Sequence, residues 1–500
     1  MNTSNILKAL GISGISDSFI GTLDTYREWY EGNVSGFHDY NIFNGTKSIP
    51  RRRTGLAMAK TVSESFADLL LNERVEFTID GKNKEEIEKV LEESMFKVRG
   101  NQLVELAFAT GTGAFVLSLE NVKVSKSGVV DQSEGNVVIR YLEARDIFPL
   151  SWDNGVMSEV AFRSTVSDIH VEEGKEFNLF TLIQEWEEDG EKVGYSITNR
   201  LFDDDGNEVE EEIFDELLPD TIKVLRLKVD KAPFAIIKPN TINFIDPNSP
   251  YGLPVFAGSL DVLREIDTVW DSLINEYNLG KKRIFIDEKA MSYDKSGNPK
   301  FDNNDVVFYT LGGLMGDGES AVGSSMKETD FKLRVEEHVQ GLKAGLNTLS
   351  QKCGLGSNYY SFDVQSGLVT ATEVISRNSA LFRSISKHSL LLEDSLIHLI
   401  EAINGLLNYI HNTSNEVKAT VNFDDSIIED RSVIEKRALL ELNEGVIDLH
   451  EYLVITRGFT DEMAQEFIDN MEKRKRGVEE EVVEVNEDGT EGEGTKDMRE

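Results

Sequence analysis

The stretch AGSLDVLREIDTVWDSLINEYNLG, residues 257–280, predicts one long amphipathic helix. Its apolar residues recur at spacings of three and four, which places them on one face of a helix; they are Leu263, Ile266, Trp270, Leu273 and Tyr277. About 24 residues at about 1.5 Å each give a rod of roughly 36 Å. Gly280 is a C-terminal cap, and the basic residues Lys281, Lys282 and Arg283 follow at the negative end of the helix dipole.

A second amphipathic helix is predicted from Glu328 to Ser350. Its apolar face contains Phe331, Val335, His338, Leu342, Leu346 and Leu349. Between the two helices, short strand signals at residues 283–286 and 306–309 alternate with Gly, Asp and Asn turns, which indicates a small α/β or β insertion. Two helices of similar length around one insertion favour an antiparallel helix hairpin with the insertion at its tip. We expect Leu263, Ile266 and Trp270 to pack against Leu342 and Leu346.

The remainder of the second half is predicted to be helical. A Gly/Ser/Asn-rich loop, CGLGSNYYSFD at residues 353–363, follows the second helix, and loops of this length are usually functional or disordered. A helix of about forty residues, from Thr370 to Asn412, leads to two or three shorter helices ending near Lys475, so we expect an all-α C-terminal third. Residues 477–500 carry ten acidic and two basic side chains and should stay solvated.

The first half predicts an α+β domain. Helical patterns at residues 54–71 and 84–96 precede β-branched and aromatic runs at residues 114–119, 137–142 and 160–166. The runs 180–186 and 195–201 flank Asp189-Gly190, a strong hairpin signal, so this half should contain an antiparallel meander. Pro247, Pro250 and Pro254 then predict a domain boundary near residue 256, because proline neither continues a helix nor donates to a strand ladder.

Composition narrows the function classes. The chain has 500 residues and a net charge of −38, which opposes tight wrapping of nucleic acid by the bulk surface. A single cysteine, Cys353, excludes an internal disulfide and a thiolate zinc site. No apolar stretch is long enough for a membrane span, and the N-terminus shows no signal segment, so we expect a soluble, cytosolic chain.

No motif in the sequence carries chemistry. A phosphate-binding P-loop is absent. Gly111-Thr-Gly113 is a fragment of a dinucleotide fingerprint and favours a turn or a close-packing site, whereas Asp203 to Gly206 favours a solvated turn over a calcium loop. The seven histidines show no metal-ligand spacing, and Arg51 to Arg53 favour a solvated basic patch over a phosphate site. We therefore expect no catalytic residue, no cofactor and no metal.

The order of segments resembles the portal proteins of tailed bacteriophages, especially siphophages of Gram-positive hosts. The resemblance spans nearly the whole chain. The matching stretches are YREWYEG (26–32), ATGTGA (109–114), DIFPLSWDNG (146–155), NSPYG (248–252), EYNLGKKRIF (276–285) and TATEV (370–374).

The resemblance implies an α+β portal-like protomer. Residues 1–256 are then the wing, residues 257–280 and 328–350 the stem helices, and residues 281–327 the clip. Residues 351–369 become the tunnel loop, residues 370–476 a long kinked helix and crown, and residues 477–500 a disordered acidic tail. Such protomers form a ring, usually dodecameric and of thirteen subunits in some isolated portals, at one capsid vertex. The chain would then be assembled in the host cytoplasm and located in the virion.

The same resemblance implies a function without catalysis. Double-stranded DNA passes through the ring during packaging and ejection, and the expected protein partners are the terminase large subunit, a head-completion adaptor, the major capsid protein and a scaffold protein. An acidic channel with few fixed cations lets DNA slide, which agrees with the net charge. The alternative is another capsid or connector component that scaffolds assembly and has no DNA channel. A metal-dependent nuclease is a third hypothesis, which no carboxylate cluster in the sequence supports.

Candidate residues follow from this mapping. The channel and tunnel-loop candidates are Lys343, Lys352, Gly354, Gly356, Asn358, Tyr359 and Tyr360. The candidates for contact with the motor or an adaptor are Lys281, Lys282, Arg283 and Phe285. The alternative role of the basic residues is to complement helix dipoles, and we expect the tyrosine rings to pack between neighbouring loops rather than touch DNA.

Overall fold

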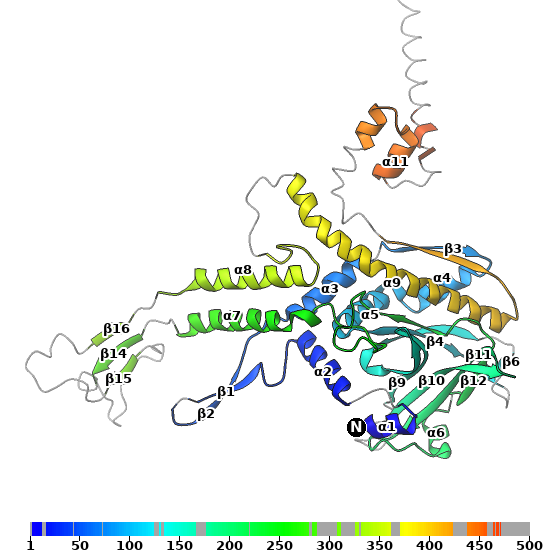
Figure 1. The fold of residues 1–500 in the computed structure, drawn as a ribbon, viewed down its shortest axis with the longest axis horizontal. Helices are drawn as coiled ribbons and strands as arrows, with labels where there is room; N and C mark the ends of the chain where they lie inside the picture. Colours follow the sequence, from blue (N-terminus) through cyan, green and yellow to red (C-terminus); the bar gives the residue numbers. More distant parts are fainter. Residues whose placement is uncertain are drawn as a thin grey trace, which may run out of the picture. The chain divides into compact units, whose positions relative to one another are not determined.

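The computed structural model describes most of the chain as two compact units, Met1–Phe423 and Asp424–Glu500 (Figure 1). The described residues are 3–12, 17–43, 45–72, 74–124, 130–131, 135–166, 177–219, 221–279, 283–287, 308–311, 326–329, 332–361, 371–423, 438–457, 464–465, 467–469 and 471. None of the helices among these described residues is long and apolar enough to cross a membrane.

The first unit mixes helices and strands, as expected for an α+β chain. Its helices are α1 Thr3–Ala9, α2 Asp17–Glu31, α3 Met58–Leu70, α4 Lys84–Glu93, α5 Phe96–Thr110, α6 Glu211–Leu217, α7 Leu260–Leu279, α8 Val335–Lys352 and α9 Ala371–His411, with short 3-10 turns η1 Ala144–Asp146 and η2 Ala257–Ser259. Its strands are β1 Asp39–Phe43, β2 Ser48–Arg52, β3 Glu76–Gly81, β4 Gly113–Glu120, β5 Lys123–Val124, β6 Val130–Asp131, β7 Asn136–Glu143, β8 Ile147–Asp153, β9 Val156–Val166, β10 Phe177–Glu188, β11 Glu191–Phe202, β12 Val224–Leu227, β13 Phe234–Ile237, β14 Arg283–Asp287, β15 Phe308–Leu311, β16 Met326–Thr329 and β17 Val417–Asn422.

The predicted antiparallel meander is confirmed. Five strands lie in the order β12-β11-β10-β9-β8, and each pairs antiparallel with its sequence neighbour. The β10–β11 turn has Asp189 at φ 53° and Gly190 at φ 82°, the two positive values that the Asp-Gly signal requires.

A second sheet, β13-β4-β7, packs with α5 and α9 around the main hydrophobic core. At the α5–β4 junction, Gly111 adopts φ 94°, and a Cβ built on it would lie 2.5 Å from the Gly252 carbonyl oxygen. The glycine is therefore needed both for the turn and for the close approach of the two backbone segments around Gly111 and Gly252. Gly111-Thr-Gly113 is a close-packing site, in agreement with the favoured interpretation of the sequence.

The proline-rich segment does not separate two cores. Tyr251, Leu253 and Phe256 are buried in the same hydrophobic cluster that extends from Tyr26 to Val421. The domain boundary predicted near residue 256 is therefore wrong, and the boundary between compact units lies after Phe423. The prolines lie in the irregular segment between β13 and η2, and apolar residues between them anchor this segment in the core.

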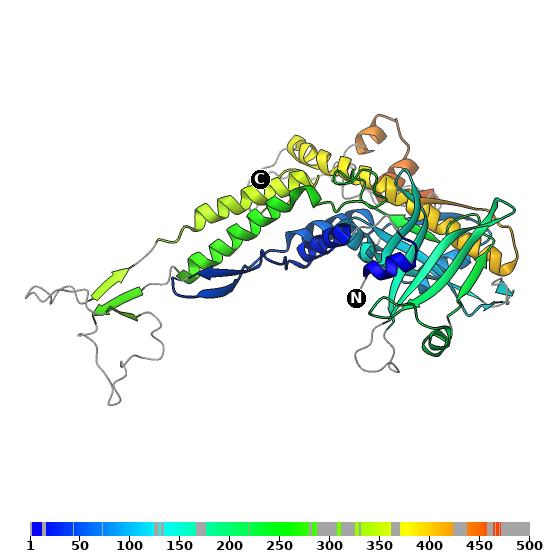
Figure 2. The ribbon, with the colours of Figure 1, turned by 60° about the horizontal axis from the view of Figure 1, so that its bottom comes forward.

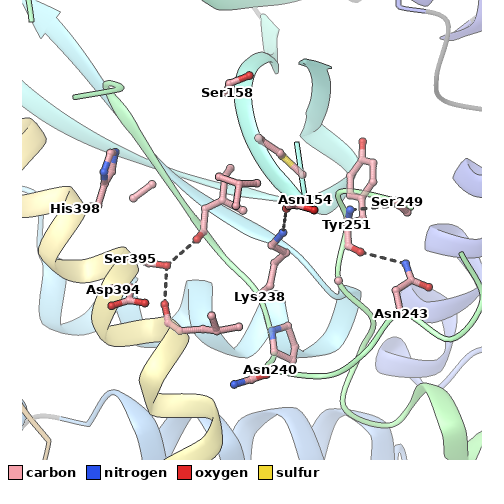
Figure 3. Close-up of a pocket in the computed structure, with 18 of the residues that line it drawn as sticks. Asn154, Ser158, Lys238, Asn240, Asn243, Ser249, Tyr251, Asp394, Ser395 and His398 are labelled. Atoms are coloured by element: carbon pink, nitrogen blue, oxygen red, sulfur yellow. Dashed lines mark hydrogen bonds between the residues drawn. The ribbon is translucent and has the colours of Figure 1, made fainter. Parts of the chain in front are cut away.

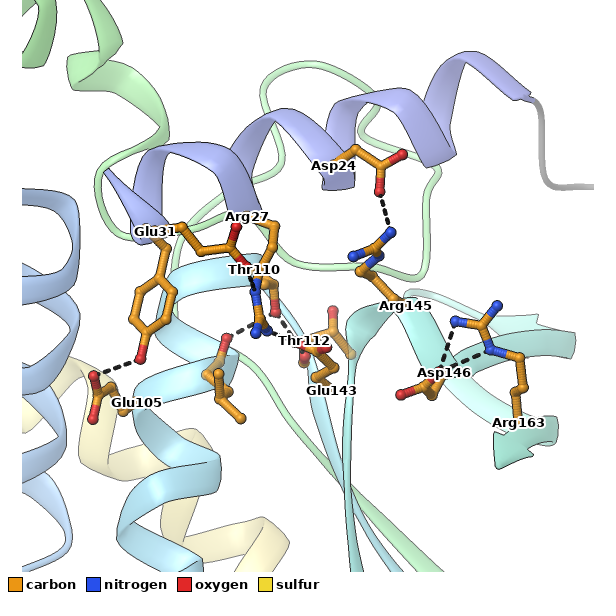
Figure 4. Close-up of polar contacts among 12 residues, drawn as sticks. Asp24, Arg27, Glu31, Glu105, Thr110, Thr112, Glu143, Arg145, Asp146 and Arg163 are labelled. Carbon is orange, nitrogen blue, oxygen red and sulfur yellow. Dashed lines mark hydrogen bonds and ion pairs between the residues drawn. The ribbon is translucent and has the colours of Figure 1, made fainter. Parts of the chain in front are cut away.

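Helix α2 is held on this core by apolar and polar contacts. Tyr26 and Trp29 are buried, and the Arg27 guanidinium pairs with Glu31 on its own helix and with Glu143 at the end of β7. Figure 4 shows Arg145 reaching back to Asp24 of α2, at 2.8 Å. The stretch YREWYEG therefore lies largely in a helix that packs on the core and is bonded to the end of β7.

Helices α7 and α8 lie side by side as the predicted helix hairpin (Figure 2). The second helix begins at Val335 rather than Glu328, because Glu328 belongs to β16 and pairs with Ile284 of β14. The insertion between the helices contains a three-stranded sheet in the order β15-β14-β16, with β14 parallel to β15 and antiparallel to β16. Its last strand therefore extends two residues beyond the predicted end of the insertion at residue 327.

The C-terminal third is not all α, which corrects the prediction. Helix α9 has the expected length of 41 residues, but the chain then forms β17, which pairs antiparallel with β3. Val417-Lys-Ala-Thr-Val-Asn422 is rich in β-branched residues, and its pairing with β3 closes the first unit. In the second unit, the structure describes α11 Leu449–Arg457 and short helical turns at 438–443, 464–465 and 467–469. Residues 477–500 lie outside the described residues.

Candidate functional site

The contact between α7 and α8 is apolar and close. Leu263 and Ile266 of α7 are buried, as are Leu342 and Leu346 of α8. A Cβ built on Gly345 would lie 2.9 Å from Cγ1 of Ile266, so glycine permits the approach of the two helices. Trp270 is half-buried and packs against the same hydrophobic cluster as these residues.

A two-pronged ion pair joins the other ends of the two helices. The Arg334 guanidinium donates to both carboxylate oxygens of Glu276, with distances of 3.1 Å from Nε and 2.8 Å from an Nη atom. These hydrogen bonds lower the pKa of Glu276 to about 2. Glu276 lies near the end of α7, just before the chain enters the three-stranded sheet, and Arg334 directly precedes α8. The ion pair therefore holds together the two helix ends from which that sheet extends.

The loop after α8 begins with a glycine cap. Gly354 has φ 82°, and the Leu355 N–H donates to the Ser350 carbonyl oxygen at 2.9 Å, which is typical of a helix ended by a left-handed residue. Leu355 is buried and supplies the hydrophobic contact of this cap. Lys352 is the last residue of α8, so the loop starts at Cys353 and not at Gln351.

The next part of the loop folds back onto α8. Gly356 and Asn358 adopt φ 86° and 59°, respectively. The Asn358 N–H donates to Oδ1 of Asn347 at 2.8 Å, and the Gln351 side-chain amide donates to the Ser357 hydroxyl at 3.2 Å. The glycine and asparagine residues named from the sequence therefore serve the local geometry of a turn.

The two adjacent tyrosines have different environments. Tyr360 is half-buried, and its hydroxyl lies 2.9 Å from the Ser65 hydroxyl on α3 and donates to the Thr61 carbonyl oxygen at 3.3 Å. Tyr359 is 40% exposed, and its ring meets the Tyr360 ring edge-on at 5.0 Å between centroids. Burial raises the pKa of both phenols. Tyr360 thus packs within its own subunit, and Tyr359 is the tyrosine presented to solvent.

The structure brings only part of the predicted set together. Lys352 and the loop residues Gly354 to Tyr360 lie at one end of α8, whereas Lys343 lies more than two turns earlier on that helix, half-buried and with polar contacts of its own. Arg283 and Phe285 lie in β14, where the structure gives the backbone alone. Lys281, Lys282 and residues 362–370 lie outside the described residues.

A buried polar network on α7 was missed by the sequence analysis. Asp267 is 3% exposed; its Oδ1 accepts the Leu56 N–H at 2.8 Å, and its Oδ2 lies 3.2 Å from Nε2 of His38. The Val34 N–H donates to Nδ1 of His38, so Nε2 carries the proton and donates to Asp267. The network ties the segment around the β1–β2 hairpin to α7. The signal for this network in the sequence is that Asp267 directly follows Ile266 of the apolar helix face.

A cleft of about 780 Å³ opens on another side of this unit, between the β8–β9 turn, residues 232–252 and α9 (Figure 3). At its base, Nζ of Lys238 donates to the carbonyl oxygens of Gly155 and Pro250, at 2.7 and 2.8 Å. Burial lowers the pKa of Lys238 to about 8. On the opposite wall, the Ser395 hydroxyl donates to the Ile236 carbonyl oxygen at 2.8 Å. No motif in the sequence predicts this cleft.

Groups suited to chemistry are not assembled in the described part of the chain. No cluster of three or more His, Cys, Asp or Glu residues there could hold a metal ion. Cys353 is buried, and its burial raises the thiol pKa to about 12, which disfavours the nucleophilic thiolate. In the Asp203 turn, the carboxylate accepts the Asn207 N–H at 2.8 Å, so this aspartate closes a turn.

The comparisons with known proteins decide the family. The family described as "Phage portal protein, SPP1 Gp6-like" matches residues 12–481. The chain belongs to this portal family. Portal proteins are structural components, so the family gives the chain a portal or connector role. No curated protein matches the chain.

Solved structures with similar folds come from gene transfer agent particles. A chain of the "Virion of native gene transfer agent (GTA) particle" has 12% identity and a TM-score of 0.38, and the match covers 91% of this portal chain and 98% of that chain. A chain of the "Neck of native GTA particle computed with C12 symmetry" has 11% identity and a TM-score of 0.37, with coverage of 80% and 88%.

Proposed function

We propose that this portal protein assembles into a closed ring, dodecameric in the particle, at one vertex of a phage capsid. Double-stranded DNA enters and leaves through the centre of the ring. The terminase large subunit docks on the ring during packaging, and a head-completion adaptor replaces it afterwards. The major capsid protein and a scaffold protein surround the ring, and the chain performs no catalysis of its own.

The observation that carries this proposal is the family match over residues 12–481. The arrangement of the first unit agrees with it, because a tightly packed helix pair carries a small sheet at one end and a compact loop at the other. The net charge of −38 supports a passage that repels phosphate and lets DNA slide.

We assign parts of the ring with the bounds that the structure gives. Helices α7 and α8 are the stem, the sheet β14–β16 is the clip that meets the motor or adaptor, and α9 with the second unit forms the crown side. The wing consists of the meander, the β13-β4-β7 sheet and the separate two-stranded sheet of β3 and β17. The tunnel loop begins at Cys353, and its first part is anchored to α8 and α3.

Within that loop, we assign contact with DNA to Tyr359 and Lys352, because both side chains are exposed. Tyr360 is a packing residue, since its hydroxyl bonds to Ser65 within the subunit. Gly354, Gly356 and Asn358 set the shape of the turn. Lys343 keeps the alternative role of a helix-surface cation.

The proposal is tested by native mass spectrometry and negative-stain imaging of the purified chain. We expect a mass near twelve or thirteen times 56.1 kDa and a central hole wide enough for a DNA duplex, about 20 Å. A closed oligomer without a hole would instead favour a scaffolding component of the connector. A chain that remains monomeric at all concentrations would contradict the ring.

A further inference from the structure

Exposed apolar side chains line the cleft and continue along the chain segments that line it. We call this set the cleft rim; its residues and their exposed fractions are Val156 70%, Ile242 81%, Phe244 60%, Ile245 58%, Leu390 61% and Leu391 38%. Val156, Ile242 and Leu391 line the cleft itself. Large apolar side chains gathered around a concave site are typical of a surface that binds another protein. The cleft shown in Figure 3 is therefore a candidate site for binding another protein segment.

A second exposed apolar surface is carried by the β1–β2 hairpin. Ile42 and Ile49 are direct cross-strand partners, each 37% exposed, and Phe43 is 70% exposed. Beyond their own pairing, β1 and β2 make no substantial contact with any other element that the structure describes. Figure 1 shows the hairpin projecting away from α2 and α7. A two-stranded ribbon is at best marginally stable by itself, so a partner surface would stabilise it.

The hairpin is basic, whereas the chain as a whole is strongly acidic. Residues 39–52 contain Lys47, Arg51 and Arg52 against a single acid, Asp39, in a chain whose net charge is −38. The cleft is lined by the carboxylate of Asp394 and by Lys238, whose Nζ donates to two backbone carbonyl oxygens, and Asp246 lies exposed in the loop that carries Ile242. A basic hairpin is therefore attracted to an acidic second copy.

A ring of identical subunits needs two different complementary surfaces on each subunit, because its repeating contact is head-to-tail. We propose that the β1–β2 hairpin of one copy docks on the cleft rim of the next copy. This inference rests on the ring in the proposed function and names one of its contacts. The acidic tail is a poor occupant, because its ten carboxylates would face Asp394 and Asp246.

The test uses one substitution on each surface, Phe43→Glu and Ile242→Glu, with Val98→Glu as the control at an exposed apolar residue outside both surfaces. All three variants should keep the melting temperature of the unassembled subunit, since the side chains are exposed. We expect Phe43→Glu and Ile242→Glu each to lose rings in native mass spectra, and Val98→Glu to keep them.

Mixing the two defective variants gives the decisive readout. Each retains one intact surface, so an equimolar mixture should form a heterodimer through the intact hairpin of one variant and the intact cleft rim of the other. An isologous contact would give no such rescue. Rings that persist in both variants, or two defects without a heterodimer, would overturn the proposal.

Crosslinking separates this inference from the proposed function. The double variant Phe43→Cys/Ile242→Cys, treated with a short bis-maleimide, should give a ladder of covalent oligomers, whereas each single variant should not. Wild-type protein treated in the same way measures the background crosslinking through the buried Cys353. Rings without a ladder would overturn the hairpin contact and leave the portal ring intact, whereas wild-type protein without rings would contradict both.

Discussion

Replacing Asp267 with alanine should destabilise the first unit strongly. The substitution leaves two donors without an acceptor, the Leu56 N–H and Nε2–H of the almost fully buried His38. An unsatisfied buried donor costs about 1–3 kcal/mol, so the gross loss is about 2–6 kcal/mol. The variant no longer buries a carboxylate, which offsets part of this loss. We expect a net loss of about 2–4 kcal/mol in the free energy of unfolding.

The pH dependence of the free energy of unfolding separates the effect of the Asp267 charge from the effect of the side chain's shape. Burial raises the pKa of Asp267 above its usual value of 3.8, so the folded state binds this proton more tightly than the unfolded state. Its charge therefore opposes folding above the folded-state pKa, and this penalty is relieved as the pH falls through that value. Asp267→Asn keeps an acceptor for the Leu56 N–H, and wild type should gain stability relative to this variant as the pH falls from 7 towards 4.

Urea unfolding at several pH values, followed by circular dichroism, measures both effects. Glu265→Ala, an exposed position on the same helix, is the control and should change stability by no more than about 0.5 kcal/mol. A loss for Asp267→Ala as small as the control would refute the network. Parallel pH profiles of wild type and Asp267→Asn would refute the raised pKa.

Three further predictions follow from the site. Ile266→Ala should cost about 2–5 kcal/mol in urea unfolding, whereas Trp270→Ala should cost less than the 3–5 kcal/mol of a fully buried tryptophan; the reverse order would contradict the helix packing described here. Tyr360→Phe should lower stability by about 1 kcal/mol through its lost hydroxyl contacts, and Tyr359→Phe should leave thermal melting unchanged; equal effects would be evidence against the division of roles. The pKa of the Glu276 carboxylate is lowered from 4.5 to about 2, so this group stabilises the fold above pH 4.5 and loses that contribution as the pH falls towards 2. Glu276→Gln should therefore flatten the acid side of the profile of stability against pH. An unchanged profile would exclude the ion pair.

Much of the fold could be predicted because local patterns agree with tertiary packing. The apolar periodicity of residues 260–279 gave α7, and Asp189-Gly190 gave the β10–β11 hairpin. The start of α8 was misplaced because residues 326–329 form a strand only through pairing with β14, which periodicity cannot show. The strand β17 was missed for the same reason, since its partner β3 lies more than 300 residues earlier.

The site was predictable in position but not in the role of each side chain. Gly354, Gly356 and Asn358 are residue types that favour turns, and all three adopt positive φ values in the structure. Sequence could not distinguish Tyr359 from Tyr360, because their different burial arises from packing against α3, a distant helix. Asp267 was unexpected, since a buried carboxylate depends on donors from residues more than 200 positions earlier.

The most direct test of the central claim is an electron cryomicroscopy map of the assembled ring. We predict a closed ring in which α7 and α8 of every subunit surround an open channel, with the loop that begins at Cys353 at its narrowest point and Tyr359 facing the channel. A ring whose channel is lined instead by the five-stranded sheet, with this loop on the outer surface, would contradict the account.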